Sequence, residues 1–313
     1  MYDPAFETSR LLSANIEKVL LGKPDVVQML VLSLIAGEHV LLEDVPGVGK
    51  TLAAKALAQS IEGSFARLQF TPDLLPADIT GSMIYRTDRH EFEFSPGPVF
   101  ANVVLADEIN RAPPRTQSAL LEAMSDARVS VDGKSHPLPS PFIVIATQNP
   151  FEFEGTYALP ESQLDRFLLR TSVGYPGREM ERQVMSTHRT GEPVDQLQPV
   201  VNVESVRHAQ MAVREVKFDD SLVEYLLDIV EATRQHDAFQ VGVSTRGALS
   251  FYRGCQARAI TESRDYVTPD DIKQLAVAAL SHRVLPEGIF QGADRHYVEQ
   301  QVADLVQQVP VPV

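Results

Sequence analysis

The sequence predicts an α/β fold, with a mainly parallel five-stranded sheet covered by helices on both faces and a second, smaller all-helical domain. Short apolar runs alternate with helical patterns through residues 1–174, as they do in parallel sheets. Some of these runs end in polar residues, which is typical of buried strands that open on a site. After residue 177 only helical periodicity continues. We therefore expect an α/β domain over 1–174 and a helical domain over 175–313.

The spacing of apolar residues locates the elements of the first domain. The predicted helices cover residues 6–21, 25–36, 50–60 and 114–126, and the predicted strands cover 39–43, 65–70, 102–106, 142–147 and 167–172. Two further segments, 81–94 and 128–138, alternate as β-hairpins do, and the second turns at Asp132-Gly133. Neither hairpin is needed to close the sheet. They are candidates for contacts with partners or a pore, and the alternative is surface decoration.

Six helices are predicted in the second domain. They cover residues 178–189, 203–215, 219–236, 245–262, 269–284 and 294–308. The start of the fifth is marked by Thr268 as a hydroxyl N-cap, followed by Pro269 in the first turn and two aspartates that favour the positive end of the helix dipole.

Composition excludes several classes of protein. With 313 residues, 44% of them apolar, the chain can fill two cores. The single cysteine, Cys255, excludes an internal disulfide and favours a reducing compartment. There is no secretory pattern at the N-terminus and no apolar run of membrane-spanning length, so we expect a cytoplasmic protein without a membrane span. The net charge of −14 opposes binding to nucleic acid.

A phosphate-binding loop is predicted at residues 44–51, between the first strand and the helix that follows it. This arrangement directs backbone N–H groups and the positive end of a helix dipole at one point. Lys50 is expected to reach the β- and γ-phosphates of a nucleotide, and the Thr51 hydroxyl to ligate Mg²⁺. The residues expected to contact the nucleotide here are Pro46, Gly47, Val48, Gly49, Lys50, Thr51 and Leu52.

The loop departs from the usual pattern at its first position, where Asp44 replaces a glycine. The turn must then form without the access to positive φ that glycine gives, and aspartate tolerates that conformation better than most residues. We expect the loop to keep its function.

Paired carboxylates end the third predicted strand and indicate hydrolysis. Asp107 is expected to hold Mg²⁺, partly through water, and Glu108 to accept a proton from an attacking water. A kinase would need no such glutamate. The alternative is an Asp-Glu pair that caps the next helix, which the phosphate loop upstream disfavours.

Four more residues complete the candidate site. Asn149 follows the fourth strand and could orient the attacking water. Arg166 could pair with a nearby acid, or could complete a neighbouring subunit's site by stabilising charge on the transferred phosphoryl group. Gln69 could couple Glu108 to a bound partner, or bond the adjacent backbone. Arg111 could sense phosphate across a subunit boundary, or pair with nearby acids.

Over nearly its full length the chain resembles the MoxR family of AAA+ ATPases. The resemblance rests on five blocks, at residues 43–51, 69–78, 107–114, 146–150 and 159–167. It implies that Lys50 and Thr51 form Walker A, that Asp107 and Glu108 form Walker B, that Asn149 is sensor 1, that Arg166 is the arginine finger, and that Arg246 is sensor 2 on the lid. Residues 81–94 then correspond to the family's insert in the second helix, and 128–138 to the hairpin before sensor 1.

The resemblance also implies a biology. It implies ATP and Mg²⁺ as cofactors, a homo-oligomer in the form of a hexameric ring, and chaperone-like remodelling or maturation of client proteins, including metal or cofactor insertion. A partner with a von Willebrand factor A domain is implied as well. Adenine is expected near Leu21-Gly22, between the first helices and the lid. The alternatives are a P-loop phosphotransferase, a nucleotide-gated scaffold that scarcely turns over ATP, and a DNA-directed motor, which the charge disfavours.

Overall fold

The computed structural model describes residues 2–150, 155–187, 191–288 and 295–312. Its centre is a five-stranded parallel sheet in the order β10-β1-β9-β6-β3. The strands are β1 (Val40–Glu43), β3 (Phe65–Gln69), β6 (Val103–Asp107), β9 (Ile143–Gln148) and β10 (Leu169–Thr171). The predicted α/β fold with a parallel five-stranded sheet is confirmed.

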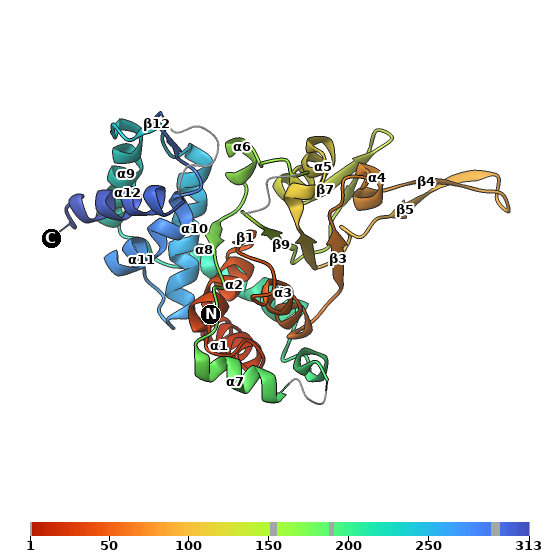
Figure 1. Cartoon of the computed structure of the whole chain (residues 1–313), viewed down its shortest axis with the longest axis horizontal. Coiled ribbons are helices and arrows are strands. Elements are labelled where there is room, and N and C mark those ends of the chain that lie inside the picture. Colours follow the sequence, from red (N-terminus) through yellow and green to blue (C-terminus); the bar gives the residue numbers. More distant parts are fainter. Residues whose placement is uncertain (1, 151–154, 188–190, 289–294, 313) are drawn as a thin grey trace.

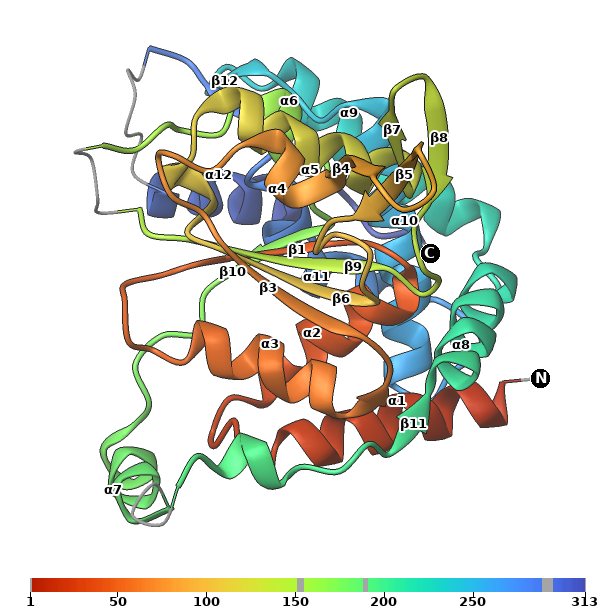
Figure 2. The same cartoon turned by 90° about the vertical axis from the view of Figure 1, so that its right-hand side faces the viewer.

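Helices cover both faces of the sheet (Figure 2). One face carries α1 (Asp3–Ile16), α2 (Pro24–Ala36) and α3 (Lys50–Gln59), and the other carries α4 (Pro76–Thr80) and α5 (Pro114–Asp126). Successive strand residues point to opposite faces, so Val40 and Leu42 join one hydrophobic cluster while Leu41 joins the other. Helix α1 ends before the predicted limit at residue 21, because a turn with Gly22 at positive φ leads into α2.

The two predicted hairpins are present and pack on each other at their bases. The first, β4 (Gly81–Arg86) with β5 (Glu91–Pro96), projects far from the sheet (Figure 1). The second, β7 (Arg128–Val131) with β8 (Lys134–Pro137), turns at Asp132 and Gly133, both at positive φ. The ring of Phe94 stacks on His136, with 4.0 Å between the ring centroids.

Several short elements lie between the main strands and helices. They are η1 (Ile109–Arg111), α6 (Glu161–Leu164), α7 (Arg178–Thr187), η3 (Pro193–Gln196) and a parallel pair of β2 (Ile61–Glu62) with β11 (Val201–Asn202).

The helical region contains α8 (Val203–Glu215), α9 (Asp220–Gln235), α10 (Thr245–Thr261), α11 (Pro269–Leu280) and α12 (Arg295–Gln308). The predicted start of α11 is confirmed: Asp271 accepts a hydrogen bond from the Thr268 backbone in a capping box. A short antiparallel pair, β12 (Phe239–Val241) with β13 (Leu285–Pro286), was not predicted, because such short segments show no periodicity. Residues 188–189 and 294, at the ends of two predicted helices, lie outside the described residues.

The α/β part and the helical region pack together through one of the hydrophobic clusters. Helix α8 packs on α1, and α10 packs on α2. One cluster of buried side chains accordingly includes Leu12 and Leu30 from the N-terminal helices together with Phe251 and Leu275 from α10 and α11. The domain boundary at 174/175 stays a prediction. Within the described ranges, no helix is both long and apolar enough to cross a membrane.

Candidate nucleotide-binding and hydrolysis site

The carboxyl ends of the central strands meet at a cavity of about 420 Å³. Strand register brings them together, because Gln69 of β3 pairs with Asp107 of β6, and Glu43 of β1 pairs with Gln148 of β9. The cavity is lined by Pro46, Gly47, Gly49, Lys50, Thr51, Arg67, Gln69, Asp107, Glu108 and Asn149. Most of the predicted site residues are therefore in one place.

The phosphate loop takes its shape from two glycines. Gly47 and Gly49 have φ angles of 84° and 96°, and a Cβ on Gly47 would meet no atom within 4 Å. Helix α3 starts directly afterwards, at Lys50, so its N-terminus faces the cavity. Backbone N–H groups and a helix dipole are thus available to a polyanion.

Asp44, which replaces the usual glycine, has no positive φ, so the turn forms without the left-handed conformation that aspartate could have tolerated. Its carboxylate instead accepts hydrogen bonds from the backbone N–H of Val45 at 2.8 Å and of Gly174 at 2.6 Å. Asp44 therefore ties the start of the loop to the segment after β10.

The ammonium group of Lys50 turns back onto carbonyl oxygens at the edge of the cavity. It donates to Asp44 O, and it lies 3.3 Å from both Val45 O and Gln148 O. Nucleotide phosphates would compete with these carbonyls as partners of a cation.

Asp107 presents one carboxylate oxygen to the cavity. Its Oδ1 accepts a hydrogen bond of 2.6 Å from the Thr147 hydroxyl, whereas Oδ2 lies 3.5 Å from Thr51 Oγ1. A hydroxyl beside a carboxylate is the donor set with which Mg²⁺ binds next to nucleotide phosphates and water. The donor set therefore fits Mg²⁺, with Thr51 and Asp107 as the residues that would hold it.

Glu108 has an unusual backbone and two side-chain partners. Its φ of 57° and ψ of 50° place it in the left-handed region, which costs a non-glycine residue roughly 1–3 kcal/mol. Its Oε2 accepts hydrogen bonds from Gln69 Nε2 at 2.9 Å and from Arg111 Nη1 at 3.1 Å. The structure thus favours coupling of Gln69 to Glu108 and pairing of Arg111 with an acid of its own chain.

Two residues at the site were missed by sequence reasoning. Arg67 forms an ion pair of 2.6 Å with Asp107, and Thr147 bonds both Asp107 and the backbone N–H of Glu108. The alternation of β3, in which Leu68 is buried, could have indicated that Arg67 and Gln69 share the opposite face. Nothing local indicated that Arg67 reaches Asp107.

Arg166 and Arg246 do not line this cavity. Arg166 donates to Leu121 O and Ser125 Oγ at the end of α5. Partial burial, and next the nearby positive charge of Arg246, lower the pKa of Arg166. The two predicted catalytic arginines are thus close enough for their charges to interact, and neither lines the cavity of its own chain.

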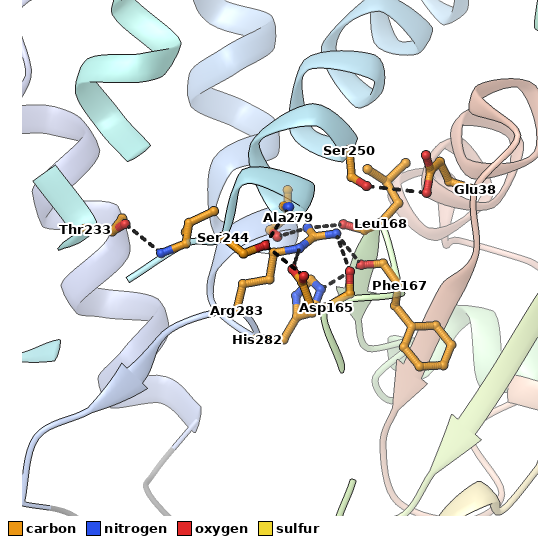
Figure 3. A network of polar contacts seen from close by, with 12 residues as sticks. Glu38, Asp165, Phe167, Leu168, Thr233, Ser244, Ser250, Ala279, His282 and Arg283 are labelled. Atoms are coloured by element: carbon orange, nitrogen blue, oxygen red, sulfur yellow. Dashed lines mark hydrogen bonds and ion pairs between the residues drawn. The ribbon is translucent and has the colours of Figure 1, made fainter. Parts of the chain in front are cut away.

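A partly buried polar network of Asp165, Ser244 and Arg283 connects the segments that carry these arginines (Figure 3). Asp165 accepts hydrogen bonds from the Ser244 hydroxyl at 2.8 Å and from Arg283 Nε at 3.0 Å. Ser244 is the N-cap of α10, whose second residue is Arg246, and the Arg283 side chain is fully buried. Because Asp165 immediately precedes Arg166, this polar network positions both arginines.

The other predicted nucleotide contacts do not line the cavity: Leu21, Gly22, Val48 and Leu52. Val48 is buried, and Leu52 packs against the core. Gly22 faces α7, since a Cβ there would lie 2.7 Å from Met180 Cγ. The predicted adenine contact at Leu21-Gly22 is therefore bordered by α7, and it stays a prediction.

The fold and the cavity define an ATPase of the AAA+ class. Residues 39–169 match the ATPase family associated with various cellular activities (AAA), and residues 231–305 match the AAA lid domain. A putative ATPase from Cytophaga hutchinsonii superposes with a TM-score of 0.88 and 36% sequence identity, covering 99% of this chain and 98% of that one.

Relatives narrow the class to a family. The protein YeaC of Bacillus subtilis is 50% identical, covering 96% of this chain and 93% of its own. Chaperone MoxR1 of Mycobacterium tuberculosis is 41% identical, with 87% and 74% covered, and Protein MoxR of Methylorubrum extorquens is 28% identical, with 95% and 93% covered. The chain belongs to the MoxR family of AAA+ ATPases.

Proposed function

We propose that this protein hydrolyses Mg²⁺-bound ATP and uses the cycle to remodel or mature client proteins. The observation that carries the proposal is one cavity in which Lys50, Thr51, Asp107, Glu108 and Asn149 meet. Lys50 and the loop N–H groups bind phosphates, Thr51 and Asp107 hold the metal, and Mg²⁺ supplies charge neutralisation at the phosphates. Glu108 accepts the proton of the attacking water, and Asn149 orients that water.

We propose further that the site is completed by a neighbouring subunit in a hexameric ring. Support comes from the position of Arg166 and Arg246, which are close to each other but absent from the cavity of their own chain. A guanidinium group must lie close to the transferred phosphoryl group to stabilise its charge. Because the two arginines do not line the cavity of their own chain, we propose that they act at the cavity of a neighbouring subunit.

The name Chaperone MoxR1 supports the chaperone-like part of the proposal. Metal or cofactor insertion, a partner with a von Willebrand factor A domain, the domain boundary at 174/175 and the cytoplasmic location stay predictions.

Phosphate release without an added acceptor tests the hydrolytic function. Wild-type protein should release phosphate from Mg²⁺-ATP, whereas Glu108→Gln should bind ATP with unchanged affinity and release phosphate roughly 10²–10⁴-fold more slowly. A phosphotransferase would instead require an acceptor. A nucleotide-gated scaffold would bind ATP but show little turnover in both wild type and Glu108→Gln. A requirement for an acceptor, or little turnover in the wild type, would overturn the proposal.

A further inference from the structure

Arg67 neutralises the carboxylate that the metal needs. Its Nη2 and Nε lie 2.6 Å and 3.2 Å from Asp107 Oδ2. Strand register explains the contact, because Arg67 pairs with Leu105 and Asp107 lies two residues further along on the same face of β6. Asp107 is buried, and a buried carboxylate is costly without a compensating cation.

The oxygen that Arg67 occupies is also the oxygen nearest the other metal donor. Thr51 Oγ1 lies 3.5 Å from the same Oδ2, whereas Oδ1 is bonded to Thr147. The Arg67 guanidinium and a Mg²⁺ ion held by Thr51 and Asp107 would therefore compete for the same oxygen atom, Oδ2 of Asp107. The Arg67 side chain is 47% exposed, so it has room to move away.

We propose that Arg67 is the resident counter-ion of Asp107 and yields Oδ2 when Mg²⁺–nucleotide binds, so that competition with Arg67 sets the metal affinity of the site. The inference rests on the proposed function, because it takes Asp107 as the metal-holding carboxylate. It assigns Arg67 a positioning role and no contact with reacting atoms.

Hydrogen bonds also connect Arg67 to Glu108, the proposed catalytic base, through Gln69. Arg67 Nη2 donates to Gln69 Oε1 at 3.1 Å, and Gln69 Nε2 donates to Glu108 Oε2 at 2.9 Å. When Arg67 leaves Asp107, the Gln69 amide loses a partner that orients it. Metal arrival at Asp107 thereby loosens the contact that restrains Glu108.

Arg67→Gln tests the competition, with Arg86→Gln as the matched control. Arg86 also forms a short ion pair, 2.7 Å to Glu93, with a side chain 49% exposed, but it lies on the hairpin away from the cavity. Mg²⁺ is titrated into each variant at a fixed concentration of fluorescent ADP, which requires binding and no hydrolysis. Arg67→Gln should lower the Mg²⁺ midpoint roughly three- to tenfold, while Arg86→Gln leaves it unchanged.

Metal-free measurements test the ion pair itself. In EDTA, Arg67→Gln should melt at a lower temperature than Arg86→Gln, because Asp107 loses its counter-ion. ADP affinity in EDTA is measured for each variant, so that a direct effect of Arg67 on nucleotide binding is separated from its effect on the Mg²⁺ midpoint. An unchanged or raised Mg²⁺ midpoint, or a melting temperature in EDTA equal to that of Arg86→Gln, would overturn the proposal. If Arg67→Gln does not fold, Arg67→Lys keeps the charge but loses the two-nitrogen contact, and its midpoint should fall below that of wild type. Absence of ATPase activity in the wild type would overturn the proposed hydrolysis. The Mg²⁺ midpoints need binding alone, so they would still test the role of Arg67.

Discussion

The side-chain amide of Gln69 donates a hydrogen bond of 2.9 Å to Oε2 of Glu108, across two strands paired at Gln69 and Asp107. Arg111 donates to the same oxygen. In this arrangement both donors hold the carboxylate that must accept a proton from water. We therefore expect that removal of either donor leaves Glu108 less restrained.

Gln69→Ala should raise the basal ATPase rate, because Glu108 then has one restraining donor fewer. A bond to a charged group is worth about 1.5–3 kcal/mol when buried and less at this exposed position, so we expect an increase of roughly three- to tenfold. Steady-state phosphate release measures it. The control is Gln235→Ala, which removes a similar amide–carboxylate bond of 2.8 Å from the surface of α9. A slower rate at unchanged nucleotide affinity would mean that Gln69 orients Glu108 for catalysis.

Lys50→Ala should abolish nucleotide binding, because it removes the ammonium group at the mouth of the phosphate loop. Lys55→Ala, further along α3, is the matched control and should bind as wild type does. Isothermal titration calorimetry with ATP compares them. Near-native affinity in Lys50→Ala would remove the phosphate-loop assignment.

Mixed assemblies should show that Arg166 serves a neighbouring site. Subunits with Glu108→Gln and subunits with Arg166→Ala should each be inactive alone and partly active together, since some interfaces then join an intact base to an intact arginine. ATPase activity is measured over a range of mixing ratios, with mixed assemblies verified by native mass spectrometry. No recovery at any ratio would mean that Arg166 acts at the site of its own chain or only stabilises the fold.

Arg246 should act from the same subunit as Arg166, because the two arginines are neighbours. Arg246→Ala subunits should then recover activity with Glu108→Gln subunits but not with Arg166→Ala subunits. The reason is that no interface in the second mixture receives both arginines from one donor. The reverse pattern would show that Arg246 serves the cavity of its own chain.

Burial of His39 should make stability depend on pH. Burial lowers the pKa of His39 from 6.5 to about 4, and its Nδ1 accepts a hydrogen bond from the backbone N–H of Val144. Between these pH values the His39 imidazole binds a proton in the unfolded chain but stays neutral in the folded chain. The stabilisation is thus complete above pH 6.5 and is lost as pH falls toward 4, by up to about 3 kcal/mol.

Urea unfolding of wild type and His39→Gln between pH 7 and pH 4.5 tests this expectation. The stability difference between the two should shrink as pH falls. Identical slopes would contradict it, and so would a His39 imidazole signal that titrates near pH 6.5 in NMR spectra of the wild type.

The sequence by itself determined the parallel sheet, the phosphate loop and the residues Lys50, Thr51, Asp107 and Glu108, because each depends on local pattern: an apolar strand, glycines at fixed spacing, then a helix. The hairpin turn at Asp132-Gly133 and the start of α11 are local in the same sense. Helix limits were less predictable: α1 ends at Ile16, before its predicted limit, and the turn that follows contains Gly22 at positive φ.

Only the tertiary structure decided how distant residues combine. Arg67 reaches Asp107 because β3 and β6 pair in one register, and a strand sequence does not specify its register with a partner. Likewise, the motif around Arg246 identifies an arginine near a helix start, but the packing of α10 against the segment at Asp165 places it beside Arg166. Local sequence fixes which chemical groups are present, and long-range packing fixes which of them meet.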